Sequence, residues 1–102
     1  MHNAGLVTAR GWAMIVEELV LSRADDESRT ELVDSLKASA DAARSVAGRS
    51  QERRRNEALD HAQRLDRVIH FLENDSLAPG SDLSDQALGE QVRAKLKARG
   101  QW

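Results

Sequence analysis

The apolar residues of this chain recur at intervals of three and four positions in four separate segments, and this period places them on one face of an α-helix. Residues that favour strands are scarce, because there are two tryptophans, one phenylalanine and no tyrosine, whereas helix-favouring Ala, Leu, Glu and Arg are abundant. A length of 102 residues is typical of one domain. We therefore predict an all-α fold over residues 1–102, a small antiparallel helical bundle of three main helices plus a shorter C-terminal helix.

The helix boundaries follow from residues that form turns and caps. We expect helices at about residues 7–23, 29–47, 51–74 and 85–99, with a linker at about residues 75–83 that contains the single proline. The loops before the second and third helices are short, so the first three helices should be antiparallel neighbours.

Specific residues are expected at the helix ends. Ser28 and Glu31 have the spacing of a capping box, and Gly48 is expected to end the second helix in the left-handed conformation. Ser50 and Ser84 are the expected caps of the third and fourth helices. Leu83 and Leu88 are placed as a hydrophobic staple at the start of the fourth helix.

The expected core is the set of apolar positions at helical spacing. It comprises Trp12, Ile15, Val16, Leu19 and Val20 in the first helix, Leu32, Val33, Leu36, Ala40, Ala43, Val46 and Ala47 in the second, Ala58, Ala62, Leu65, Ile69 and Leu72 in the third, and Leu88, Val92 and Leu96 in the fourth. The first helix also carries Val7, Met14 and Leu21, spaced by seven on another side. A helix that is apolar on two sides is central or shared with a partner, so we predict that this stripe is the interface of a homo-oligomer, most simply a dimer.

Composition and charge exclude several classes of protein. The net charge is −2, and neither half of the chain contains a polybasic arm for nucleic acid. Without cysteine there are no disulfides and no thiolate metal sites. The chain has no apolar stretch long enough for a membrane span and no signal peptide, so we expect a cytoplasmic protein that is not bound to a membrane. The Ala/Arg/Asp-rich, Lys-poor composition suggests a bacterial or phage origin.

Arg53, Arg54 and Arg55 crowd the first turn of the third helix, an end that normally prefers acidic residues. One interpretation is that Glu52, Glu57 and acids of the second helix, such as Asp41, neutralise them. The other is a patch that binds an acidic partner surface or a phosphate, since guanidinium groups pair with both in a bidentate manner. Consecutive helical residues point about 100° apart, so the three cannot all serve one small ligand; Arg54 is expected on the apolar side, with Arg53 and Arg55 to either side of it.

The C-terminal segment QVRAKLKARGQW is a second basic cluster. Arg93 and Lys97 share one face of the expected helix, and Lys95 and Arg99 share another. Cations in the last turn complement the helix dipole, which is a purely structural role. The alternative is a docking site for an acidic protein or a nucleic acid, next to a Trp102 that we expect to be exposed.

Residues 55–61, RNEALDH, resemble the R-x(4–6)-H pattern of HEPN-domain ribonucleases over these seven positions. The resemblance implies a dimer that brings two Arg/His pairs together around RNA, with His61 moving a proton and Arg55 stabilising phosphate charge. Arg55 and His61 are, however, six positions apart, which places their side chains on different sides of a straight helix. His61 lies on the apolar flank of that helix. We assign no family from it and rank ribonuclease activity behind the binding functions.

Asp66, His70 and Glu73 line one face of the third helix at metal-ligand spacing. The Glu-x-x-His motif of carboxylate sites in bundles is absent, and a polar helix face commonly carries such residues. We predict no metal and no cofactor.

No catalytic set of residues is present in the sequence. Our leading hypothesis is a non-enzymatic helical interaction protein, a small bacterial or phage regulator, adaptor or inhibitor that binds a macromolecular partner as a homo-oligomer. The alternative is a binder of nucleic acid or a nucleotide through Arg53, Arg54 and Arg55.

Overall fold

The structure, a computed structural model, describes residues 9–102, with side chains from Ile15 onward. The described residues form four α-helices and no strand: α1 (Ala9–Ala24), α2 (Arg29–Gly48), α3 (Glu52–Asn74) and α4 (Leu83–Ala98). The predicted all-α bundle is confirmed, and the helix bounds differ from the predicted ones by at most two residues wherever both are described. Within the described part, none of the helices is both long and apolar enough to cross a membrane.

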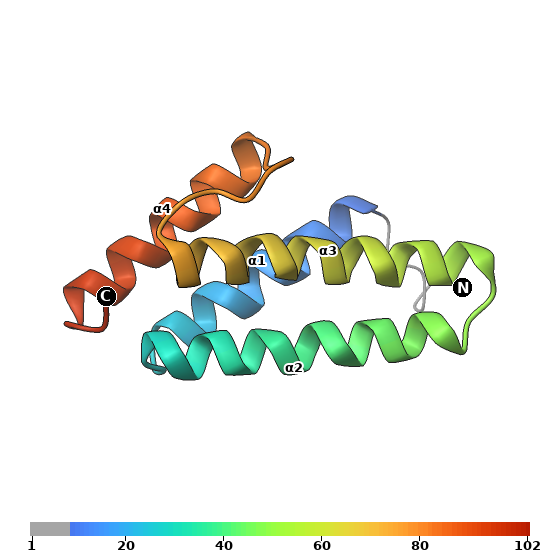
Figure 1. Ribbon diagram of the computed structural model, residues 1–102, viewed down its shortest axis with the longest axis horizontal. Helices are drawn as coiled ribbons and strands as arrows, with labels where there is room; N and C mark the ends of the chain where they lie inside the picture. Colours follow the sequence, from blue (N-terminus) through green and yellow to red (C-terminus); the bar gives the residue numbers. More distant parts are fainter. Residues whose placement is uncertain (1–8) are drawn as a thin grey trace, which may run out of the picture.

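An antiparallel hairpin of α2 and α3 forms the long axis of the molecule, whose largest extent is 44 Å (Figure 1). The first helix, α1, lies obliquely across the hairpin, and α4 packs against α1 and α3. The turn between α2 and α3 projects at the end of the molecule opposite α4 and the C-terminus (Figure 1). Because α4 lies at the other end, the turn is left accessible.

The core forms where the four apolar stripes meet. Its completely buried members are Val16, Val20 and Ala24 of α1, Leu32, Leu36 and Ala40 of α2, Leu65 and Leu72 of α3, and Val92 and Leu96 of α4. Two predicted core residues are wrong, because the side chains of Ile15 and Val46 are 41% and 40% exposed. On α1, Val16, Val20 and Ala24 are completely buried, whereas Leu19 is only partly buried against the core. The side chain of Trp12, also predicted in the core, lies outside the described ones.

The predicted stripe Val7, Met14 and Leu21 falls largely outside the described side chains. Val7 and the side chain of Met14 lie outside them. The third member, Leu21, is half-buried and packs against the core of its own chain.

The start of α2 agrees with the sequence, and the turn that follows α2 does not. The capping box of Ser28 and Glu31 is present, and the hydrogen bond from the Ser28 N–H lowers the pKa of the Glu31 carboxyl. Gly48, however, is the last residue of α2 and has no left-handed conformation; Arg49 follows as the cap. Ser50 is not the cap of α3, because its hydroxyl donates to the Val46 carbonyl at 2.6 Å and Gln51 takes the cap position.

At the start of α4 the capping residue is Asp82 instead of the predicted Ser84. The Asp82 carboxylate accepts from the Asp85 N–H at 2.8 Å, which lowers the pKa of Asp82, and Asp85 accepts from the Asp82 N–H in return. Leu83 thus becomes the first helical residue. It is 82% exposed, so the predicted staple between Leu83 and Leu88 does not form.

A buried ion pair joins three of the helices. Arg64 of α3 and Asp85 of α4 are 7% and 5% exposed, and their side chains are 2.9 Å apart. Arg64 also contacts Glu17 of α1 at 3.2 Å and the Ser84 hydroxyl at 2.8 Å, while Arg67 holds the second oxygen of Asp85 at 2.8 Å. Because the charges are removed from water, each must keep its partners for the fold to remain favourable.

The C-terminal residues fold back onto the bundle. Trp102, expected to be exposed, is half-buried: the Arg29 guanidinium lies 3.9 Å from its ring centroid and the Phe71 ring 5.8 Å away. Arg99 donates to the carbonyls of Ala24 and Glu27, both at 2.7 Å, and so caps the end of α1. The tail is therefore part of the packed structure.

We predict that Asp85→Asn lowers the free energy of unfolding by about 3–5 kcal/mol, because it leaves the buried Arg64 charge without its main counter-ion. Urea denaturation followed by circular dichroism measures this loss. The matched control is Asp66→Asn, which breaks the exposed pair with Arg44 (44% and 51% exposed) and should cost less than about 1 kcal/mol. Equal losses in the two variants contradict the central role of the Arg64–Asp85 pair.

Candidate functional site

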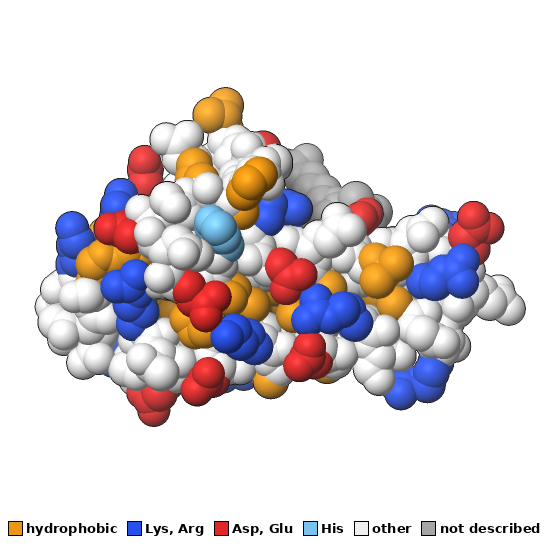
Figure 2. All heavy atoms as spheres, viewed as in Figure 1, with side chains coloured by type: hydrophobic (Ala, Val, Ile, Leu, Met, Phe, Trp, Pro, Cys, Tyr) orange, Lys and Arg blue, Asp and Glu red, His pale blue; other side chains and the backbone are white. Residues whose placement is uncertain are grey.

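The end of the α2–α3 hairpin carries a dense group of arginines. Four of the seven residues from 49 to 55, here named the hairpin tip, are arginines: Arg49, Arg53, Arg54 and Arg55. All four are exposed. Arg54, expected on the apolar side, is exposed as well. Lys and Arg side chains are visible at this end of the molecule in the space-filling view (Figure 2).

The backbone of the hairpin tip adds positive potential. The first N–H groups of any helix lack a partner within the helix, and that end of the helix carries partial positive charge. In α3 the cap residue Gln51 provides no side-chain hydrogen bond to them. The start of α3 therefore has no side-chain cap, and guanidinium groups surround it.

The acids that were expected to neutralise these arginines do so only slightly. Arg53 lies 3.7 Å from Glu57 of its own helix and is 85% exposed. Asp41 of α2 instead pairs with Arg44 at 2.8 Å. No ion pair holds Arg54 or Arg55 among residues 15–102. Of the acids named in this interpretation, Glu57 contacts Arg53, whereas Asp41 of α2 pairs with Arg44 instead.

The basic C-terminal cluster has a structural role. Arg93 pairs with Asp75 at 2.9 Å and lies 5.4 Å from the Phe71 ring centroid, and Lys95 pairs with Asp25 at 2.7 Å. With Arg99 bound to backbone carbonyls, three of the four cations hold the bundle together. Lys97 is exposed and makes no ion pair with any described residue.

The residues of the ribonuclease-like pattern have different environments. Arg55 is exposed in the first turn of α3, whereas His61 is half-buried nearly two turns later. His61 lines an open groove of about 290 Å³, here named the tip groove, whose other lining residues are Leu19 of α1, Ser39, Ala42, Ala43 and Val46 of α2, and Ala58 of α3. Burial lowers the pKa of the His61 imidazole. The surroundings are those of a packed histidine.

Asp66, His70 and Glu73 do not form one group in the structure. Asp66 pairs with Arg44 at 3.1 Å and Glu73 pairs with Lys37 at 3.1 Å, so each carboxylate faces a cation of α2. Across the described residues, no three His, Cys, Asp or Glu side chains are grouped so that they could hold a metal ion. Asp66 and Glu73 tie α3 to α2.

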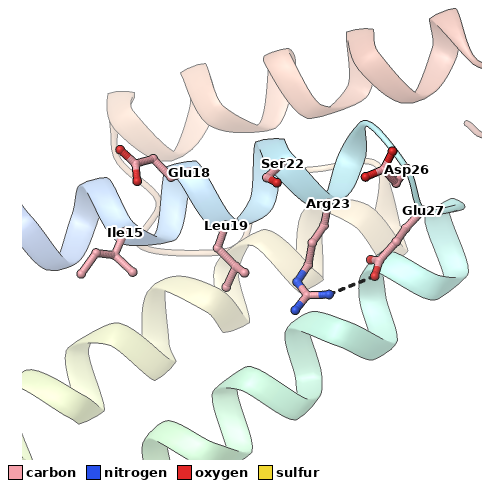
Figure 3. Close-up of a pocket in the computed structure, with 7 residues that line it drawn as sticks. All are labelled: Ile15, Glu18, Leu19, Ser22, Arg23, Asp26 and Glu27. Atoms are coloured by element: carbon pink, nitrogen blue, oxygen red, sulfur yellow. Dashed lines mark hydrogen bonds and ion pairs between the residues drawn. The ribbon is translucent and has the colours of Figure 1, made fainter.

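A second groove lies along α1 and was not expected from the sequence. It has a volume of about 610 Å³ and is lined by Ile15, Glu18, Leu19, Ser22, Arg23, Asp26 and Glu27. The close-up shows Ile15, Leu19 and Arg23 on the hairpin side of α1 and Glu18, Ser22 and Asp26 along its other edge; the dashed line marks the Arg23–Glu27 pair, 3.0 Å long (Figure 3). Leu19 lines both grooves, so this α1 groove and the tip groove adjoin at Leu19.

Comparison of the chain with protein-family models, with characterised proteins and with solved structures gave no match.

We predict that His61 makes stability fall as the pH drops from 7 to 5. Burial lowers its pKa below the usual 6.5, so in this range the unfolded chain binds more protons than the folded chain and stability is lost on acidification. The lowered carboxyl pKa values of Glu31 and Asp82 act at lower pH, since their usual values are 4.5 and 3.8. Melting temperatures measured between pH 5 and 8 should show a shallower slope for His61→Gln than for the wild type. An unchanged slope contradicts the prediction.

Proposed function

We propose that this chain is a cytoplasmic, non-enzymatic interaction protein, a small bacterial or phage regulator, adaptor or inhibitor that acts as a homo-oligomer. In this proposal the hairpin tip binds an acidic surface of a macromolecular partner, which we take to be a protein. One observation supports it above the others: the cations that are not used inside the fold are concentrated at the hairpin tip.

Most of the other Lys and Arg side chains among the described residues contact a carboxylate or a backbone carbonyl. Those held by carboxylates or backbone carbonyls are Arg23, Arg29, Lys37, Arg44, Arg64, Arg67, Arg93, Lys95 and Arg99. At the tip, among residues 15–102, the Arg49 side chain contacts only the Ser45 hydroxyl and the Arg53 side chain only Glu57, at 3.7 Å. Lys97 is the one comparable cation elsewhere in residues 15–102. Exposed guanidinium groups that do not stabilise the fold are suited to bind carboxylates of another molecule.

The directions of the side chains favour a broad partner surface over a small ligand. Successive residues of α3 point about 100° apart, so Arg53, Arg54 and Arg55 cover more than half of the helix circumference. A small anion contacts one or two of them, whereas an acidic protein surface around the end of the helix contacts more. Complementary charge also steers association and raises its rate.

A second candidate function is binding of an anionic ligand, either a nucleic acid or a nucleotide. The observation that favours it is the start of α3, where Gln51 leaves the first N–H groups without a side-chain cap. Such a helix start binds phosphate, and the arginines extend its reach. Phosphate-led binding to a nucleic acid weakens steeply with salt, so a salt series with a single-stranded oligonucleotide tests this candidate directly.

We predict that the double variant Arg53→Ala, Arg55→Ala keeps the helical circular dichroism and melting temperature of the wild type but binds its partner at least tenfold more weakly. Each hydrogen bond to a charged group contributes about 1.5–3 kcal/mol, and about 1.4 kcal/mol corresponds to a factor of ten. The partner is first captured from the native host with the wild-type protein and then titrated by calorimetry against each variant.

The matched control is Lys37→Ala, Lys97→Ala, which removes the same charge from exposed positions away from the tip. It should bind like the wild type. Equal loss in both double variants indicates a general charge effect, and unfolding of the arginine variant indicates a structural cluster. Either result contradicts the proposal.

A further inference from the structure

The tip groove and the α1 groove form one surface with an ordered distribution of charge. Arg54 lies one helical turn before Ala58, a lining residue, and so stands at the tip end of the surface. The middle is apolar and includes Leu19, Val46 and Ala58. Two exposed carboxylates lie along one edge of α1: Glu18 beside the apolar residues Ile15 and Leu19, and Asp26 at the end of the helix away from the tip (Figure 3). Arg54 and Asp26 therefore lie toward opposite ends of the surface, with the apolar residues between them.

The residues of this surface are incompletely used inside the chain. Ile15 and Val46 are about two-fifths exposed, although both are large and apolar. No cation among residues 15–102 forms an ion pair with Glu18 or Asp26, and no acid there pairs with Arg54. The alanines and the serine on α2 allow another helix to approach closely, because small side chains shorten the distance between packed helices.

We propose that a second copy of this chain occupies this surface, so that the two grooves form the interface of a two-fold symmetric dimer. In such an interface the same patch is used on both subunits, and each contact occurs twice. An antiparallel arrangement about the two-fold axis pairs the apolar middle parts and brings Arg54 of one copy to the acidic edge of the other. The surface meets the requirement for such a dimer because opposite charges flank its apolar centre.

The inference rests on the homo-oligomer part of the proposed function and assigns Arg54, one of the three arginines at the start of α3, to the dimer in place of the partner. Arg54 faces the second copy, while Arg53 and Arg55 point to either side and remain for the partner. Loss of dimerisation and loss of partner binding can therefore be measured in different variants. Leu21, the described member of the stripe Val7, Met14 and Leu21, lines neither groove.

The first test places a charge at the apolar centre. Val46→Glu should weaken self-association at least about tenfold, because a carboxylate would be buried against alanines. The control is Leu77→Glu, which changes an equally exposed apolar residue in the linker after α3 (40% for both) and should leave self-association unchanged. Sedimentation velocity from about 1 to 100 μM measures the association, and circular dichroism verifies that both variants are folded.

The second test exchanges charges. One variant carries Arg54→Glu, and a second variant carries both Glu18→Lys and Asp26→Lys. Each should be a monomer by itself, because like charges would face each other twice in its homodimer. Mixing these two variants should restore a dimer, since each contact then joins opposite charges again. This result is specific to the proposed pairing, because general loss of stability in either variant cannot restore association.

A wild type that is monomeric at about 100 μM overturns the inference. Dimers that persist in Val46→Glu, or variants that do not associate when mixed, overturn it as well. If Val46→Glu destabilises a monomeric protein much more than Leu77→Glu does, the occupant of the groove is another part of the same chain. If no dimer forms, the proposed partner binding by Arg53 and Arg55 is still tested separately, by the Arg53→Ala, Arg55→Ala variant.

Discussion

The buried contact between Arg64 and Asp85 determines how the helices can be arranged. The α2–α3 hairpin is held by a continuous apolar face, but α1 and α4 meet α3 around this guanidinium group, which reaches Glu17 on one side and Asp85 and Ser84 on the other. Asp85 also belongs to the capping box of α4, so the same carboxylate sets where α4 begins and where it packs. A buried ion pair can contribute little net stability and still specify one arrangement, because other packings leave a charge without a partner.

This arrangement leaves the two ends of the molecule with different properties. At one end, α4 and the folded-back Trp102 cover the end of α3, and the cations Arg29, Arg93, Lys95 and Arg99 are bound within the fold. At the other end the hairpin tip projects, with its arginines exposed (Figure 1). Similar basic clusters in the sequence therefore have different environments, depending on whether a neighbouring helix supplies acids or carbonyls.

Periodicity predicted the fold class and most of the core, because the spacing of apolar residues directly determines which side of a helix can be buried. It did not predict the helix ends where several residues could act as caps. Ser84 and Asp82 are both good caps, and Asp82 takes the position because Asp85 returns its hydrogen bond. Gly48 is conformationally permissive but is not required to turn left-handed, and the chain turns after it.

The sequence also did not indicate the contacts that depend on tertiary structure. Arg64 precedes Val68 by four positions and Phe71 by seven, which places it on a second buried side of α3. This spacing was the available signal, but an arginine on an apolar side is usually taken to extend into water. Arg93, Lys95 and Arg99 donate hydrogen bonds to carboxylates or carbonyls at least 18 positions away in the chain. For this reason the spacing within a helix identified both basic clusters, but it could not show that the C-terminal cluster is bound within the fold while the hairpin tip is exposed.

The geometry of α3 also explains how one cluster of arginines can serve two proposed surfaces. Arg54 shares a side of the helix with Ala58 and borders the tip groove, and its neighbours in the sequence point about 100° to either side. In the proposed dimer, Arg54 is placed opposite acids of the other copy, and each subunit keeps Arg53 and Arg55 directed outward. The dimer then presents two basic tips, one at each end of the shared surface. A partner with two acidic patches gains affinity from such an arrangement without any new contact, because the second binding event becomes intramolecular.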